Sequence, residues 1–167
     1  VATLSDHRDS VTHLQFDEAG ANLLSSDPSG SIKTWGVLAL DDDPVFEKRR
    51  KGVRTAIYSP DGASYVTADR KGRVHFYNLL TGDKEKELTG ATPEPRVLTM
   101  SSDGRYIATG GVGNSITVWE MPLETPVDVL DGHTGEITSL VFSPDNSMLL
   151  SADKEGALMV WEIETAY

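Results

Sequence analysis

The feature that most constrains this chain is a period of 42 residues. Counting back from the C-terminal end, the aromatic residues Trp161, Trp119, Tyr77 and Trp35 are separated by this step. Two further positions recur with the same spacing, the large apolar Phe142, Met100, Tyr58 and Phe16, and the hydroxyl-bearing Ser151, Thr109, Thr67 and Ser25. A fixed period of this length is typical of architectures built from similar units packed side by side.

Each period reads as short β-strands joined by tight turns. Residues 136–143 alternate apolar and polar side chains, and residues 147–152 and 157–163 are further strand-like runs. Pro-Asp-Asn at 144–146 and Lys-Glu-Gly at 154–156 are turn signals between them. We therefore predict an all-β chain of four blades, each a four-stranded antiparallel sheet, arranged as in a β-propeller.

The fourth repeat resembles a WD40 repeat. It contains the Gly132–His133 pair, the Phe-Ser-Pro-Asp turn at 142–145, a hydroxyl at Ser151 and an aromatic at Trp161. The resemblance covers one unit, residues 1–167, with repeats at about 1–36, 37–78, 79–120 and 121–162. It implies a structural side-chain network, for which the candidates are His133, Ser151 and Trp161, then His7, Ser25 and Trp35, and in the third repeat Thr109 and Trp119.

Two departures from the family pattern have consequences. The family's structural Asp, six residues before the aromatic, is replaced by Ser29, Lys71, Gly113 and Glu155, while Asp27, Asp69 and Asp153 lie eight residues before it. This pattern predicts that no blade has the full network. The second repeat also has Arg49 at the His position and Tyr77 at the Trp position.

Four blades are few for a ring of this kind, and the sequence leaves three ways to complete one. Residues 1–4 align with the outer strand of a blade and could close the last one. Two chains could join head to tail as an eight-bladed homodimer, the chain could be part of a larger propeller, or four blades could close on themselves.

Catalysis and cofactor chemistry are not expected. The Ser and His residues occupy repeated structural positions, and no nucleophile elbow or phosphate-binding loop is present. The Gly-rich run at 110–113 falls between two strands and is interpreted as a tight turn. The four His residues lack metal-ligand spacing, the Asp run at 41–43 reads as a solvated loop, and there is no Cys. With no signal peptide or membrane-length apolar run, we expect an intracellular protein, cytoplasmic or nuclear.

Charge distribution suggests where a partner would bind. The net charge is −11, yet residues 44–90 contain ten of the fifteen Lys and Arg residues. The predicted loops of blade two, at 47–52 and 69–73, should place Arg49, Arg50, Lys51, Arg70 and Lys71 on one rim. We predict a protein-interaction scaffold that binds an acidic or phosphorylated peptide there. The alternative is a nucleic-acid or ribonucleoprotein component that uses the same basic loops.

Overall fold

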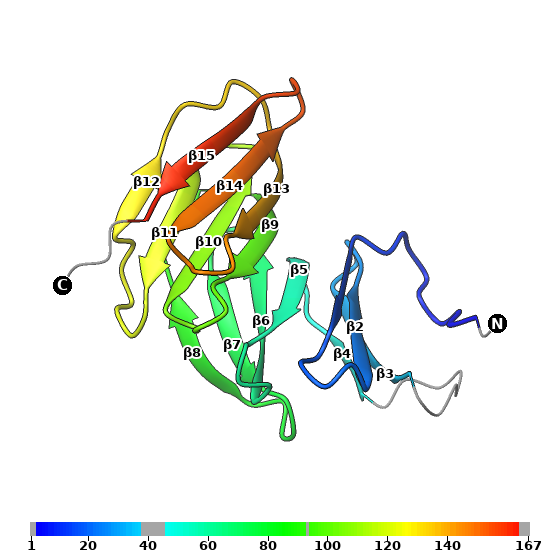
Figure 1. Ribbon diagram of the computed structural model, residues 1–167. Helices are drawn as coiled ribbons and strands as arrows, with labels where there is room; N and C mark the ends of the chain where they lie inside the picture. Colours follow the sequence, from blue (N-terminus) through cyan, green and yellow to red (C-terminus); the bar gives the residue numbers. More distant parts are fainter. Residues whose placement is uncertain (1–2, 38–45, 93, 164–167) are drawn as a thin grey trace.

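A computed structural model describes residues 3–37, 46–92 and 94–163. All of the regular secondary structure within these ranges is β-strand (Figure 1). No helix there is long and apolar enough to cross a membrane. The strands are β1 (His13–Phe16), β2 (Asn22–Ser26), β3 (Ser31–Gly36), β4 (Phe46–Arg49), β5 (Val53–Tyr58), β6 (Ser64–Asp69), β7 (Val74–Asn78), β8 (Lys84–Leu88), β9 (Pro95–Met100), β10 (Tyr106–Gly111), β11 (Ile116–Glu120), β12 (Asp128–Leu130), β13 (Ile137–Phe142), β14 (Met148–Asp153) and β15 (Leu158–Glu162).

The strands form four antiparallel sheets, which confirms the predicted blades. Blade one is β1–β4, blade two is β5–β8, blade three is β9–β12, and blade four is β13–β15. The first three have four strands, whereas blade four has three within the described residues. Thr3 and Leu4, which were expected to supply an outer strand, lie outside any strand, and Val1 and Ala2 lie outside the described residues.

The sheets are offset from the predicted sequence repeats at each junction, because β4, β8 and β12 fall in the repeat after their own blade, and the first of these offsets matters for function. Residues 47–49 were predicted to lie in a loop of blade two, but they belong to β4, the outer strand of blade one, where Arg49 pairs with Ser31. In a propeller blade the outer strand precedes the connection to the next blade. Only Arg50–Gly52 therefore remain as the connection into β5.

The apolar core lies between the blades, in three layers. One layer joins blades one and two through Leu24 and Ile32 against Tyr58 and Tyr65. The second joins blades two and three, and the third joins blades three and four. Since a single sheet is too thin to bury both of its faces, each blade depends on its neighbours for burial.

The innermost strands surround a shared space, as expected for a propeller axis. A cavity of about 480 Å³ is lined by residues of β1, β5 and β9 and by Leu140 of β13.

The Gly-rich run at 110–113, which was predicted to be a tight turn, is only partly a turn. Gly110 and Gly111 belong to β10, and only Val112 and Gly113 form the turn. A Cβ on Gly110 would lie 2.8 Å from Ile137, so blade four packs on bare backbone at this point.

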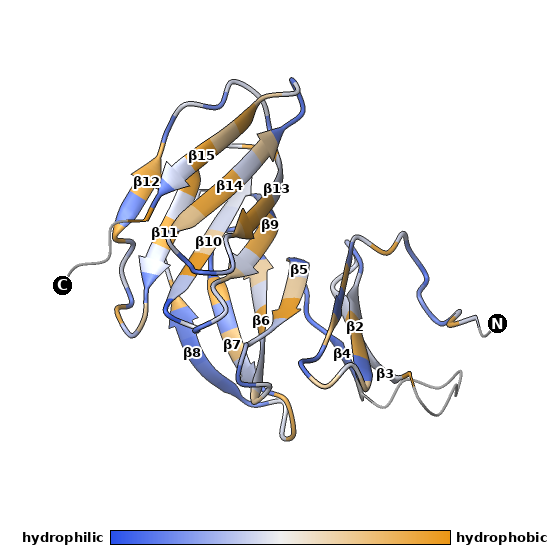
Figure 2. Ribbon diagram, viewed as in Figure 1, coloured by the Kyte–Doolittle hydropathy of each residue, from blue (hydrophilic) through white to orange (hydrophobic). Residues whose placement is uncertain are grey.

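The two end blades each leave one apolar face uncovered. Figure 1 shows blade one and blade four on opposite sides of the two middle blades, and Figure 2 shows apolar residues along β14 and β15. Leu14 and Phe16 of blade one and Leu158 and Val160 of blade four are exposed. Within the described residues the four blades thus form an open arc and not a closed ring.

Candidate functional site

Blade four contains a complete chain of hydrogen bonds through its sheet. Trp161 Nε1–H donates to Ser151 Oγ (2.8 Å), whose hydroxyl donates to His133 Nε2 (2.6 Å). His133 Nδ1–H then donates to Asp153 Oδ2 (2.8 Å). The imidazole and the carboxylate are buried, where such chains are strong because water does not compete.

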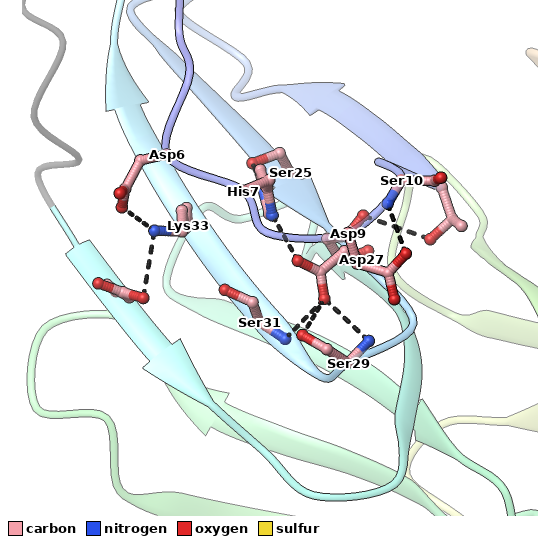
Figure 3. Close-up of polar contacts among 12 residues, drawn as sticks. Asp6, His7, Asp9, Ser10, Ser25, Asp27, Ser29, Ser31 and Lys33 are labelled. Carbon is pink, nitrogen blue, oxygen red and sulfur yellow. Dashed lines mark hydrogen bonds and ion pairs between the residues drawn. The ribbon is translucent and has the colours of Figure 1, made fainter.

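Blade one repeats this chain with the same atoms. Trp35 Nε1–H donates to Ser25 Oγ (2.7 Å), the hydroxyl donates to His7 Nε2 (2.6 Å), and His7 Nδ1–H donates to Asp27 Oδ2 (2.7 Å). Figure 3 shows His7 between Ser25 and Asp27, with Asp27 also receiving hydrogen bonds from the turn that follows it. The N-terminal segment is held to the sheet through this histidine.

These two networks overturn the prediction that no blade would have a full set. The acid comes from the position eight residues before the aromatic, occupied by Asp27 and Asp153, and not from the position six residues before it. The geometry explains why this position works. Asp153 Oδ1 accepts the backbone N–H groups of Glu155 (3.0 Å) and Ala157 (2.9 Å), which leaves Oδ2 for the histidine. One carboxylate thereby closes the turn and orients the ring.

The electrostatics of Asp153 reflect these bonds. Burial would raise the pKa of the carboxyl, but the hydrogen bonds from His133 and from the backbone of Ala157 and Gly135 lower the pKa to about 2. The pKa of Asp27 is also lowered, against the effect of burial, by Ser29, His7 and the Ser31 backbone. Both acids therefore stay charged in the folded protein at neutral pH.

The middle blades do not assemble this network. In blade three the Trp119 indole donates to the Thr89 carbonyl (3.3 Å), and the buried Thr109 hydroxyl has no partner among the described residues. The predicted Thr109–Trp119 pair is therefore not formed. In blade two the Thr67 hydroxyl is likewise buried without a partner in the described part of the chain. Asp69 keeps its turn but binds Arg73 (2.6 Å).

The Ser and His residues of the complete networks are placed for structure. Ser25 and Ser151 are buried, and each oxygen already accepts an indole N–H. A serine nucleophile needs an oxygen that faces substrate, with the base on one side and donors for an oxyanion on the other. Among residues 3–37, 46–92 and 94–163, no group of three His, Asp or Glu could hold a metal ion. Asp41–Asp43 lie outside these ranges.

The predicted basic patch is divided by the fold. Lys51, Arg70 and Lys71 are exposed and line one pocket of about 510 Å³, together with Arg73 and Asp69. Arg49 instead lines a separate pocket on blade one, beside Asp6, Asp27 and Glu47. Three of the five predicted residues are therefore brought together, and Arg49 lies in a pocket of mixed charge that Arg8 and Lys33 also line.

Arg50 is half-buried against blade two and is not part of the predicted patch. Its guanidinium lies over the Tyr77 ring, 4.0 Å from the centroid, and Nη2 donates to the Gly82 carbonyl (2.7 Å) and to the Tyr65 hydroxyl (3.3 Å). Tyr77 and Tyr65 stack with centroids 5.1 Å apart. The smaller tyrosine in the Trp position thus supports an arginine in a cation–π contact.

Sequence reasoning missed two arginines in the neighbourhood of Arg70, Arg54 at the start of β5 and Arg96 at the start of β9. A signal for them exists, because they are 42 residues apart and occupy the same position in neighbouring blades. Burial lowers the pKa of Arg54, and Arg70 and Arg96 lower it further, partly opposed by Glu94. Arg70 and Arg96 are therefore the neighbouring cations that act on Arg54.

Comparison with known protein families also sets the second repeat apart from the other three. The family described as WD domain, G-beta repeat matches residues 1–36, 82–120 and 124–162. The matched ranges leave out residues 37–81, where the His and Trp positions are occupied by Arg49 and Tyr77. A comparison with curated proteins gives no match.

Proposed function

Because the chain belongs to the WD40-repeat family, we propose that it is a non-catalytic scaffold that holds partner proteins on its blade faces and loops. Propellers of this family generally act as protein-interaction scaffolds. The structural use of Ser25 and Ser151 supports this proposal, because it occupies the hydroxyls that hydrolysis would need.

The partner we propose is an acidic or phosphorylated peptide, and one observation carries this choice. Lys51, Arg70 and Lys71 are exposed around one pocket of a chain whose net charge is −11. Arg73 and Asp69, which also line it, neutralise each other at 2.6 Å. The remaining cations attract carboxylates or phosphates, and a peptide lying across them would replace surface water with charge-assisted hydrogen bonds.

The test is binding of a fluorescent glutamate-rich peptide, followed by anisotropy as salt rises. Wild-type affinity should fall with salt, because exposed charges are screened. The double variant Lys51→Glu/Lys71→Glu should lose about tenfold or more in affinity, as expected when two charge-assisted contacts are reversed. The matched control, Lys84→Glu/Lys86→Glu, changes the charge equally on the outer strand β8 and should bind like wild type.

Two outcomes would reject this proposal. Equal losses in both double variants would mean that only net charge matters. Tighter binding of a single-stranded oligonucleotide than of the peptide would favour the alternative function, a nucleic-acid or ribonucleoprotein component that uses these basic loops.

A further partner that we propose is a second copy of this chain, joined head to tail. The different exposure of equivalent residues in the repeat supports this proposal. Leu150 on the open face of blade four is 39% exposed, whereas its equivalents Leu24, Val66 and Ala108 are fully buried against the next blade. Val141 and Val160 flank Leu150 as cross-strand partners and widen the same face.

Blade one carries the matching face. Phe16 is 55% exposed, whereas its equivalents Tyr58 and Phe142 are 3% and 8% exposed because a preceding blade covers them. The open face of blade four is therefore equivalent to the faces by which blades one to three pack against the next blade. The open face of blade one is equivalent to the faces by which later blades pack against the preceding blade. Two copies would satisfy both faces and give eight blades.

A further inference from the structure

Arg54 and Arg96 begin the innermost strands of blades two and three and occupy equivalent positions in the repeat. The corresponding residues of blades one and four are Thr12 and Thr138, so only the two middle blades place a cation here. The strands β5 and β9 that carry the arginines pack against each other around the central cavity. The fold thus places two positive charges, Arg54 and Arg96, at the starts of adjacent inner strands, at the same end of the propeller axis.

Arg70 is tied to the same place by its backbone. Its N–H donates to the Gly52 carbonyl (2.9 Å), and its carbonyl accepts from the Glu94 N–H (3.0 Å). Gly52 lies two residues before Arg54, and Glu94 lies two residues before Arg96. The turn that carries Arg70 is therefore hydrogen-bonded to the segments that lead into both inner strands. These backbone contacts bring three arginines from three segments into one region.

These charges are incompletely compensated within the protein. The Nε of Arg54 is buried and has no hydrogen-bond partner among the described residues. Arg96 has an ion pair with Glu136 (3.3 Å), but that carboxylate also binds Lys154 (2.7 Å). A buried guanidinium N–H without an acceptor costs free energy, and neighbouring cations add repulsion, so a bound anion would relieve both.

We propose that Arg54, Arg70 and Arg96 bind the phosphoryl group of a phosphorylated peptide. This inference rests on the proposed scaffold function and names the chemical group that its basic surface recognises. A phosphate dianion offers three acceptor oxygens and more charge than one carboxylate, and guanidinium groups bind it in a bidentate manner.

A single phosphoryl group fits this site better than a nucleic-acid strand does. The positive region is local, because the chain outside residues 44–90 contains twenty of the twenty-six acidic residues. Glu94 and Glu136 lie beside the cluster itself. A strand with a phosphate at every nucleotide would extend from the cluster into this acidic surface, whereas a peptide with one phosphate need not.

The test uses a probe without sequence context, N-acetyl-phosphoserine amide, and the Arg Nε–H signals in ¹⁵N NMR spectra. Titration should shift the Arg54 signal saturably, and N-acetylserine amide should not. Arg54→Gln and Arg96→Gln should each weaken binding about tenfold or more, since each removes a hydrogen bond to a charged group. Arg54→Lys should recover only part of the affinity, because it restores the charge but not the planar fork.

The matched control is Arg105→Gln, which removes one cation that is paired with Glu120 (2.6 Å). It should bind the probe like wild type, and melting temperatures establish that all variants fold. Absence of a saturable shift, or wild-type affinity in Arg54→Gln, would overturn the inference. So would a twelve-residue oligothymidylate that binds more tightly than the probe per phosphate. If the glutamate-rich peptide still binds at Lys51 and Lys71, the scaffold proposal survives such a result.

Discussion

Ser151 and Thr109 occupy the same position in blades four and three, yet their hydroxyls have different surroundings. Ser151 joins the Trp161 indole to His133, whereas the Thr109 hydroxyl is buried without a partner in the described part of the chain. A buried donor or acceptor that loses its partner costs about 1–3 kcal/mol, whereas replacing an unpaired hydroxyl by a methyl group removes such a cost. The two positions should therefore respond in opposite directions to loss of the hydroxyl.

We expect Ser151→Ala to lower the free energy of unfolding by about 2–3 kcal/mol, because it leaves both the indole and the imidazole unpaired. Thr109→Val, which keeps the side-chain shape, should leave stability unchanged or raise it. Urea unfolding followed by tryptophan fluorescence measures both. Equal destabilisation by the two substitutions would show that the bonds of Ser151 add nothing to stability.

At the scale of strands and turns, Gly30 links the β2–β3 turn to the chain entering blade two. Arg50 N–H donates to the Gly30 carbonyl (2.8 Å), and a Cβ on Gly30 would lie 2.0 Å from the Arg50 carbonyl oxygen. Gly62, in the β5–β6 turn, has a similar left-handed φ of 67°, against 84° for Gly30, but its Cβ would meet nothing within 4 Å. The two glycines differ mainly in the space around them.

Gly62→Ala should cost about 1–2 kcal/mol, the cost of a side chain in left-handed backbone. Gly30→Ala should cost that amount and a further 1–3 kcal/mol or so, because the turn must move away from the Arg50 carbonyl. Urea unfolding of both variants at one pH gives the comparison. A Gly30→Ala cost no larger than that of Gly62→Ala would mean that the β2–β3 turn can move away from the Arg50 carbonyl without loss of stability.

The sequence determines these elements better than it determines their side-chain partners. The resemblance of the fourth repeat to a WD40 repeat predicted that His133, Ser151 and Trp161 come together, and the hydrogen bonds of blade four confirm it. It did not identify Asp153 as the acid, since the carboxylate is selected by the turn that it closes. Nor could it place Arg50 over the Tyr77 ring of blade two, because that contact depends on the space beside the ring. Arg54 and Arg96 could have been found, since the 42-residue period relates them.

For the whole molecule, the proposed head-to-tail dimer makes a specific prediction about its ends. Light scattering should give a mass twice the 18.1 kDa of one chain. Phe16→Asp on blade one and Val160→Asp on blade four should each yield monomers, because a charge in an apolar layer is costly. Leu80→Asp is the control, since Leu80 is 94% exposed in the β7–β8 turn, away from both faces.

A mixture of the two monomeric variants tests the direction of the contact. Phe16→Asp retains an intact face on blade four, and Val160→Asp retains an intact face on blade one. Together they can form one undamaged interface, so the mixture should contain dimers that neither variant forms alone. A monomeric wild-type chain would contradict the proposal, and so would a mixture that stays monomeric.

The three apolar layers between the blades also give the arc a polarity. In the layer between blades three and four, the face that carries the Ser151 network covers the opposite face of the preceding blade. Blade one has the Ser25 network on its uncovered side, while Leu24 and Ile32 on its other side pack against blade two. Every layer therefore joins a front to a back. Such a surface accepts additional blades in one orientation only, so the number of blades in a ring can change while the chemistry of each junction stays the same.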